Sequence, residues 1–272
     1  MTEETRRGLA GLDTSRPNVA RMNDYFLGGK DNFAADREAA EEILAIAPEV
    51  RAMAKEAQDF QVRVLRYLIG EGITQFINIG TGLPSGYNTH QIAQELTPEA
   101  RTAYVSRDPV VLSHARALLA LDARTTVVEG DILHPADLLA DARLRGVIDL
   151  DRPLAVVMLG VLQFTPDADD PFKRVAELRD RLPAGGHMVI AHAVLDSRPE
   201  SAQPIVDVYK RILGREEDPS RTREQVLGFF EGLRLIEPGL VYLRQWRPAN
   251  PLAVRRPESV WMVGGVGRKE DG

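Results

Sequence analysis

The sequence contains no cysteine among its 272 residues. Disulfide bonds, thiolate metal sites and cysteine nucleophiles are therefore excluded, and the composition is compatible with a reducing cytoplasm. No uninterrupted apolar run is long enough to cross a bilayer, and the mostly polar residues 1–7 lack the apolar core of a secretory signal. We therefore expect a cytoplasmic protein without a membrane-spanning segment.

Positive charge is scarcer than negative charge, and the formal net charge is −6. A nucleic acid is therefore not expected as a partner, because such binding depends on neutralising phosphates with Lys and Arg. The hydrophobic share of 44% suits one globular domain, or one domain with a small appendage.

One stretch organises the rest of the chain. Residues 75–79 have the apolar composition of a buried strand, Gly80-Thr81-Gly82 allows a tight turn, and residues 87–96 have helical spacing, with Ile92, Ala93 and Leu96 on one face. A strand, a glycine-rich turn and a helix form the first half of a βαβ unit. Its backbone amides are expected to favour an anionic or polar ligand.

Strands and helices alternate after this stretch. This alternation predicts an α/β fold of the Rossmann-like, doubly wound type, with a mostly parallel sheet, an antiparallel edge and helices on both faces. The expected helices lie at 17–27, 36–47, 50–69, 87–96, 109–121, 135–143, 169–182, 204–213 and 222–230. The expected strands lie at 75–79, 102–105, 125–129, 154–162, 187–194, 233–236, 241–243 and 260–266.

The amino-terminal helices precede the first strand, so we expect two units. Residues 1–72 form a helical segment with a lid, in which residues 1–16 are a mobile tail, and residues 73–272 form the Rossmann-like domain. Ligands of such sheets bind beyond the carboxyl ends of the strands. That rule selects residues 78–82, 106–108, 130–132 and 159–163 as the binding region.

Glycine-rich and acidic motifs recur along nearly the whole chain. They are Asp24–Phe33, Ile79–Pro84, Asp108–Leu112, Gly130-Asp131, Phe229–Leu233, Glu237–Val241 and Gly267–Lys269. In this order they resemble a class I S-adenosylmethionine-dependent methyltransferase, and most closely the actinobacterial S-adenosyl methyltransferase family. The resemblance implies S-adenosylmethionine as cofactor, a small-molecule substrate and a place in secondary metabolism. A homodimer is a further expectation.

The resemblance also implies roles for individual residues. The backbone of Gly80, Thr81 and Gly82 would face the methionine part of the cofactor. Asp131 and Ile132 would meet the adenine, and Leu159 would border the methionine and the acceptor. The block 24–33 would close over the site as a lid, with Lys30 or Asn32 contacting a carboxylate. Arg21 would bind the methionine carboxylate through its two-pronged guanidinium group.

The chain departs from the family pattern where the cofactor should lie. Asn78 and Ser106 stand where the family usually has Asp, and Asp108 could partly replace the missing ribose-binding carboxylate. Gln163 stands where His is usual. These departures leave two rivals to methyl transfer, which are a repurposed enzyme catalysing displacement, cyclisation or elimination, and a binding protein without turnover.

Methyl transfer depends largely on positioning, and a general base helps when the acceptor is a hydroxyl or an amine. His192 is the best histidine candidate, because it lies near the carboxyl end of the fifth strand, although a satisfied buried histidine fits equally well. Asp24 and Tyr25 at the start of the lid block are the other catalytic candidates. His187 is expected at a solvated strand edge. No metal site is expected, since the acidic cluster around Asp169 also fits a helix cap.

Overall fold

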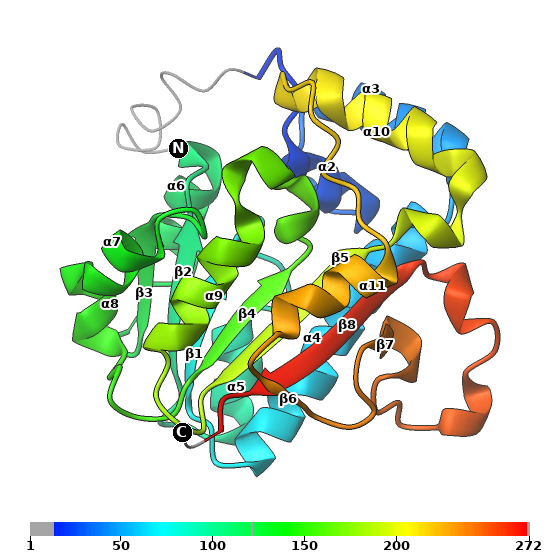
Figure 1. The fold of residues 1–272 in the computed structure, drawn as a ribbon. Helices are drawn as coiled ribbons and strands as arrows, with labels where there is room; N and C mark the ends of the chain where they lie inside the picture. The colour runs from blue at the N-terminus through cyan, green and yellow to red at the C-terminus, as the bar shows by residue number, and fades with distance from the viewer. Residues whose placement is uncertain (1–13, 121, 271–272) are drawn as a thin grey trace.

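The structure is a computed structural model that describes residues 14–120 and 122–270. Within these ranges an eight-stranded sheet forms the centre of the molecule (Figure 1). Its order is β3 (Thr125–Glu129), β2 (Arg101–Ser106), β1 (Gln75–Ile79), β4 (Ala155–Leu159), β5 (His187–Ala193), β8 (Met262–Arg268) and β6 (Arg234–Leu235), with β7 (Val241–Tyr242) also paired to β8. Strands β1 to β5 run parallel, whereas β8 is antiparallel to β5.

Successive side chains of each strand pack alternately into two hydrophobic cores, one on each face of the sheet. Phe76 of β1 packs on one face with α4 (Val50–Gly70) and α5 (Thr89–Leu96). Ile77, the next residue, packs on the other face with α9 (Pro171–Arg181). This alternation follows from the two-residue period of a strand, and both faces are apolar because both are covered.

The remaining helices complete these layers. On the α4 face, α6 (Pro109–Leu118) covers β2 and β3, while α7 (Pro135–Ala140), α8 (Ala142–Val147) and α11 (Arg223–Leu227) lie on the α9 face. Three more helices gather at one end of the sheet in Figure 1. They are α2 (Val19–Phe26), α3 (Ala34–Ile46) and α10 (Pro199–Leu213).

The predicted fold class is confirmed, and the differences lie at element ends. The fourth strand stops at Leu159 because Gly160 turns the chain with a φ of 71°. The single helix predicted at 135–143 is two helices, since Asp141 caps α8 with its side chain. Helix α10 begins at Pro199 rather than at residue 204, so Pro204 lies inside it. Part of the predicted tail, residues 1–13, lies outside the described residues.

Two predictions about single side chains are wrong. His187 is buried, not solvated, because β8 pairs along β5 and covers the edge on which it was expected. Leu96, expected on the inner face of its helix, is exposed; Thr89, His90 and Ala93 are the buried residues of α5.

Helix α4 and strand β8 approach each other closely at Gly264. A methyl group at this position would lie 2.6 Å from Leu243 Cδ2 and 2.8 Å from Phe60 Cζ, which is inside van der Waals contact. Phe60 also packs edge-on against the buried ring of Trp246. Arg63 of α4 donates to the carbonyl oxygens of Leu243 and Trp246 at 2.6 and 2.9 Å. The longest amino-terminal helix is therefore tied to the carboxyl-terminal part of the sheet.

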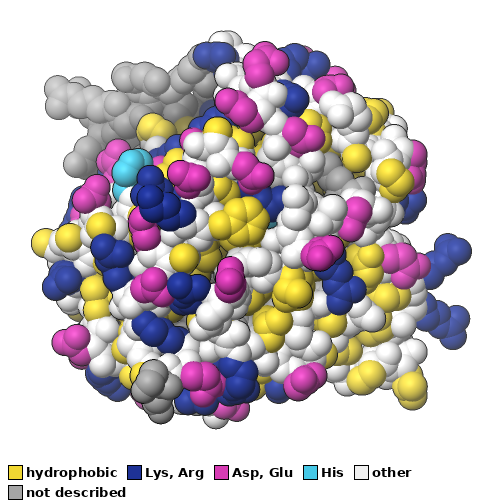
Figure 2. All heavy atoms as spheres, viewed as in Figure 1, with side chains coloured by type: hydrophobic (Ala, Val, Ile, Leu, Met, Phe, Trp, Pro, Cys, Tyr) yellow, Lys and Arg dark blue, Asp and Glu magenta, His cyan; other side chains and the backbone are white. Residues whose placement is uncertain are grey.

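The surface carries charges of both signs. Over the described residues visible in Figure 2, acidic and basic side chains are interspersed, and neither kind forms a continuous patch. No helix in the described part of the chain is long and apolar enough to span a membrane. The division at residues 72 and 73 falls between α4 and β1 and stays a prediction.

Candidate functional site

A cavity of about 750 Å³ opens at the carboxyl ends of the parallel strands. This size is in the range typical of sites for small molecules and cofactors. The cavity brings together many of the residues expected there, and the glycine turn after β1 borders it. These lining residues are Asn78, Gly80, Thr81, Gly82, Ser106, Asp108, Asp131, Leu159 and His192.

The glycine turn contributes open space to the cavity more than it contributes free backbone N–H groups. The N–H groups of Gly80 and Thr81 donate to the carbonyl oxygen of Val105 at 2.9 and 3.2 Å, so they join the ends of β1 and β2. Gly80 has a φ of 72°, and a methyl group there would lie 2.5 Å from Val161 Cγ2. A methyl group on Gly82 would meet nothing within 4 Å. Gly80 therefore shapes the turn, and Gly82 leaves the cavity open.

Alanine at these two glycines is expected to separate folding from binding. Gly80→Ala should lower the free energy of unfolding by about 1–3 kcal/mol, because the new methyl group clashes and the positive φ is strained. Gly82→Ala should change stability by less than about 0.5 kcal/mol, yet weaken a ligand that lies against the turn. Urea unfolding and calorimetric titration of both variants measure the two effects. Equal destabilisation by both variants would contradict this assignment.

Asn78 lines the cavity at the end of β1. Its side-chain N–H donates to Thr89 Oγ1 at 2.9 Å, and Gln61 of α4 donates to the same oxygen at 3.1 Å. The carbonyl oxygen of the Asn78 side chain makes no hydrogen bond within the described chain. Asn78 therefore holds the start of α5 and keeps one acceptor for a ligand.

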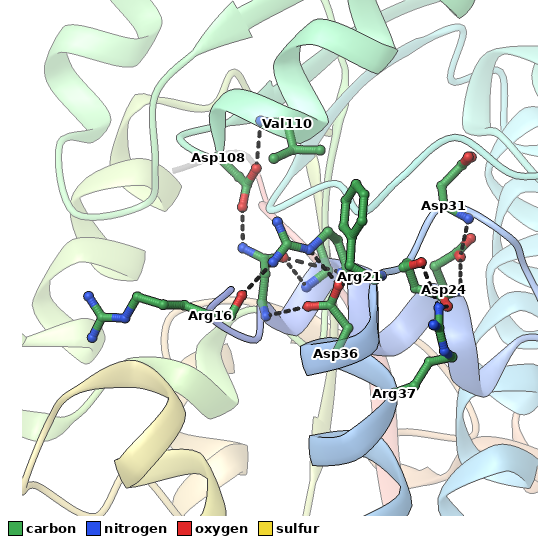
Figure 3. A network of polar contacts seen from close by, with 12 residues as sticks. Arg16, Arg21, Asp24, Asp31, Asp36, Arg37, Asp108 and Val110 are labelled. Carbon is green, nitrogen blue, oxygen red and sulfur yellow. Dashed lines mark hydrogen bonds and ion pairs between the residues drawn. The ribbon is translucent and has the colours of Figure 1, made fainter. Parts of the chain in front are cut away.

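Ser106 ends β2 and Asp108 follows it, as expected, but the carboxylate of Asp108 is already engaged. One of its oxygens caps α6 by accepting from the N–H groups of Val110 and Val111 at 2.8 and 3.1 Å. The other oxygen accepts from the side chain of Asn18, the residue that caps the amino terminus of α2 (Figure 3). Ser106 Oγ accepts from the Asp108 N–H at 3.1 Å and can still donate its own proton. Ser106 is therefore the freer partner for a ribose hydroxyl.

A buried ion pair joins α2 and α3 behind this contact (Figure 3). Asp36 at the start of α3 is fully buried, and it accepts from Arg21 Nε at 2.7 Å and from the N–H groups of Asn18 and Phe33, both at 2.8 Å. Arg21 also donates to the Arg16 carbonyl oxygen at 2.6 Å. Arg21 does not line the cavity, because its guanidinium group is paired inside the lid.

Of the predicted lid block, Phe26 and Leu27 line the cavity, whereas Asp24, Tyr25, Lys30 and Asn32 do not. Asp24 accepts from the Asp31 N–H at 2.9 Å and from the Asn32 side chain at 2.8 Å, which closes the loop around it. A methyl group on Gly29 would lie 1.9 Å from Asp24 Oδ1, so this position needs glycine. Tyr25 donates to Glu41, and Lys30 is exposed. The binding and catalytic roles expected of Asp24, Tyr25, Lys30 and Asn32 stay predictions.

Asp131 lines the cavity after β3. Its Oδ1 accepts from the Leu133 N–H at 2.9 Å and from His134 Nδ1 at 3.0 Å, and its Oδ2 lies 3.4 Å from Arg107 Nη1. These contacts fix the carboxylate, while Oδ2 has only one long partner. Ile132 is buried in the core and does not line the cavity, so its expected contact with adenine stays a prediction.

His192 is buried, and the protein binds both of its ring nitrogens. Nδ1 lies 2.6 Å from the carbonyl oxygen of Ala193, which can only accept, so Nδ1 carries the proton. The lone pair of Nε2 then faces Arg221 Nη1 at 3.4 Å. Burial lowers the pKa of His192 to about 4, and Arg221 acts in the same direction. Of the two interpretations of His192, the structure favours the satisfied buried histidine.

Asn18 and Tyr209 are among the lining residues that sequence reasoning missed. Asn18 stands directly before the helical spacing of α2, and Asn is a preferred residue at that cap position, so its cap role could have been found. Its bond to Asp108 could not, because that partner is 90 residues away. Tyr209 of α10 lines the cavity without any motif around it. Within the described ranges no cluster of acidic or histidine side chains could hold a metal ion.

The sequence matches one protein family over nearly its whole length. A family model described as S-adenosyl methyltransferase matches residues 5–270. A DUF574 family protein from Streptomyces avermitilis is 36% identical, with a TM-score of 0.88 over 94% of this chain and 99% of that chain. A candidate methyltransferase from Thermobifida fusca is 37% identical, with a TM-score of 0.87 over 96% of this chain and 98% of that chain.

More distant similarity concerns the fold alone. A structure described as PigF with SAH is 14% identical, with a TM-score of 0.51 over 86% of this chain and 68% of that chain. Among curated proteins, none matches this chain.

Proposed function

This chain belongs to the S-adenosyl methyltransferase family, whose cofactor is S-adenosylmethionine, and from this premise we propose that it methylates a small molecule of secondary metabolism. The observation that carries the proposal is a single cavity with a polar end and an apolar end. The polar end follows β1, β2 and β3, and the apolar end lies under α2, α4 and α10. A polar cofactor and an apolar acceptor would then meet inside one enclosure.

The residues of the polar end fit the cofactor. Gly82 leaves open space at the turn, Asn78 has an unused acceptor, and the Ser106 hydroxyl can donate to a ribose oxygen. Asp131 Oδ2 is available to accept from the exocyclic amine of adenine. When bound, S-adenosylmethionine would supply a methyl group on a sulfonium centre: an acceptor lone pair would bond to the methyl carbon, the carbon–sulfur electron pair would stay on sulfur, and any acceptor proton would be released to bulk solvent outside the cavity.

Positioning is the main contribution of this chain to catalysis. His192 has no free lone pair, and its lowered pKa makes it a weak base at neutral pH. The apolar residues of the cavity exclude water around the acceptor, and the lid helix α2 borders both ends of the cavity. Holding two reactants in line can by itself remove a large part of a displacement barrier, on the order of 7–11 kcal/mol at best.

Calorimetric titration with S-adenosylmethionine and S-adenosylhomocysteine tests the proposal. We expect both to bind with dissociation constants of about 1–100 µM, as is common for enzyme substrates. Asn78→Asp should raise the preference for S-adenosylmethionine about tenfold, or about 1.4 kcal/mol, because only this ligand is a cation. Asn250→Asp, which adds the same charge outside the cavity, is the control.

One outcome would contradict methyl transfer. If neither ligand binds the natural chain, and both bind after Asn78→Asp is combined with Ser106→Asp, the chain has lost its cofactor and a non-methylating reaction is the better assignment. The family match favours methyl transfer over that alternative.

A further inference from the structure

Charge is confined to one end of the cavity. Among the described residues that line it, the Asp, Glu, Lys and Arg side chains are Arg107, Asp108 and Asp131, and all three follow β2 or β3. The opposite end, which we call the acceptor chamber, is lined by residues of α2, α3, α4 and α10, by Phe164 after β4 and by residues around the start of β8. Its polar side chains, such as Asn23 and Gln58, are uncharged.

Most of the acceptor chamber is hydrocarbon. Several of its residues, including Met53, Ile205 and Val206, are themselves largely buried. Its apolar residues include Phe26, Ile43, Met53, Phe164, Ile205 and Trp261.

Tyr209 provides one hydrogen-bonding group in this chamber. Its ring packs edge-on against Phe164, with 5.0 Å between the centroids, which fixes its orientation. Tyr209 is half-buried, and its hydroxyl makes no hydrogen bond with any residue that the structure describes, so it can bind a ligand in the cavity. Burial raises the pKa of Tyr209, so the hydroxyl stays protonated and can donate.

We propose that the acceptor is an uncharged, mostly apolar molecule with one hydroxyl or carbonyl oxygen, which binds the Tyr209 hydroxyl. This inference rests on the proposed function and deepens it. A charged acceptor would lose its hydration in the chamber without meeting an opposite charge, and an unpaired buried charge is strongly disfavoured. An apolar acceptor gains from burial, and one oxygen gives the otherwise unpaired Tyr209 hydroxyl a partner.

Three probes with the same ring system test the chamber by calorimetry, with the full chain saturated with S-adenosylhomocysteine. They are 2-naphthol, naphthalene-2-sulfonate and 2-naphthylmethylammonium, which are neutral, anionic and cationic. We expect 2-naphthol to bind at least about tenfold more tightly than either ion. Tyr209→Phe should weaken 2-naphthol about threefold to tenfold, the effect of one neutral hydrogen bond. Tyr67→Phe removes a hydroxyl outside the cavity and should leave binding unchanged.

The outcomes separate this inference from the proposed function. Equal or tighter binding of either ion, no binding of any probe, or no effect of Tyr209→Phe would overturn it. Absence of S-adenosylhomocysteine binding would instead count against the proposed function. The same three probes on the free protein would then still decide the character of the chamber.

Discussion

Asp36→Ala is expected to lower the free energy of unfolding by about 3–5 kcal/mol, the usual cost of removing one partner of a buried ion pair. Asp36 is fully buried, and its carboxylate accepts from Arg21, Asn18 and Phe33. Without it, the guanidinium group of Arg21 stays buried without its counter-ion. Urea unfolding at neutral pH measures the loss. Because Asn18 also contacts Asp108, the same change should weaken cofactor binding.

Asp59→Ala is the matched control for this prediction. Asp59 pairs with Lys55 at 2.6 Å on the surface of α4, where both side chains are well exposed. Exposed pairs of this kind contribute about 0.3–0.5 kcal/mol. A loss below about 1 kcal/mol for Asp36→Ala would show that the lid does not depend on the buried pair.

Acid is expected to destabilise the protein by about 4 kcal/mol between pH 7 and pH 5, through His187 and His192. Burial together with nearby Arg268 lowers the pKa of His187 to about 4, and burial together with nearby Arg221 lowers the pKa of His192 to about 4. For His187, Arg234 acts in the same direction and Glu270 in the opposite one. A histidine in the unfolded chain has a pKa of about 6.5. Below about pH 6.5 the unfolded chain therefore binds more protons than the folded chain.

The sign of this effect follows from the lowered pKa values. The stabilisation is present above about pH 6.5 and is lost as the pH falls toward 4, by about 2 kcal/mol per histidine at pH 5. Urea unfolding across this range measures the slope, and His187→Gln should remove about half of it. Ring signals of either histidine that titrate near pH 6.5 in the folded protein, or equal stability at pH 7 and pH 5, would contradict the prediction.

Most of the fold could be predicted because local pattern and tertiary packing agree. Apolar runs such as residues 75–79 form strands buried on both faces, and the alternation with helices fixes a parallel sheet. Element ends were predicted less well, because they depend on turn geometry. The hydrophobic periodicity of the sequence predicts neither the positive φ of Gly160 nor the start of α10 at Pro199.

Only those site residues whose position follows from the backbone topology could be predicted from the sequence. Residues at the ends of parallel strands must lie together, so Asn78, Ser106 and Asp131 meet at one cavity. Pairings between side chains follow no such rule. From the sequence, Arg21 could pair with a ligand carboxylate or with the carboxylate of Asp36. The folded chain shows that it pairs with Asp36. His192 likewise lies at the expected strand end, but Arg221 faces its unprotonated nitrogen, Nε2.

The close approach at Gly264 limits which part of the amino-terminal segment can move as a hinged cover over the cavity. Phe60 of α4 sits where a side chain at Gly264 would be, and Arg63 anchors the same helix to Leu243 and Trp246. Any swing of α4 would break these contacts together, whereas α2 reaches the sheet end through Asn18 and Asp108. An opening that preserves the α4 contacts must therefore bend between α3 and α4, leaving α4 as a fixed wall of the cavity.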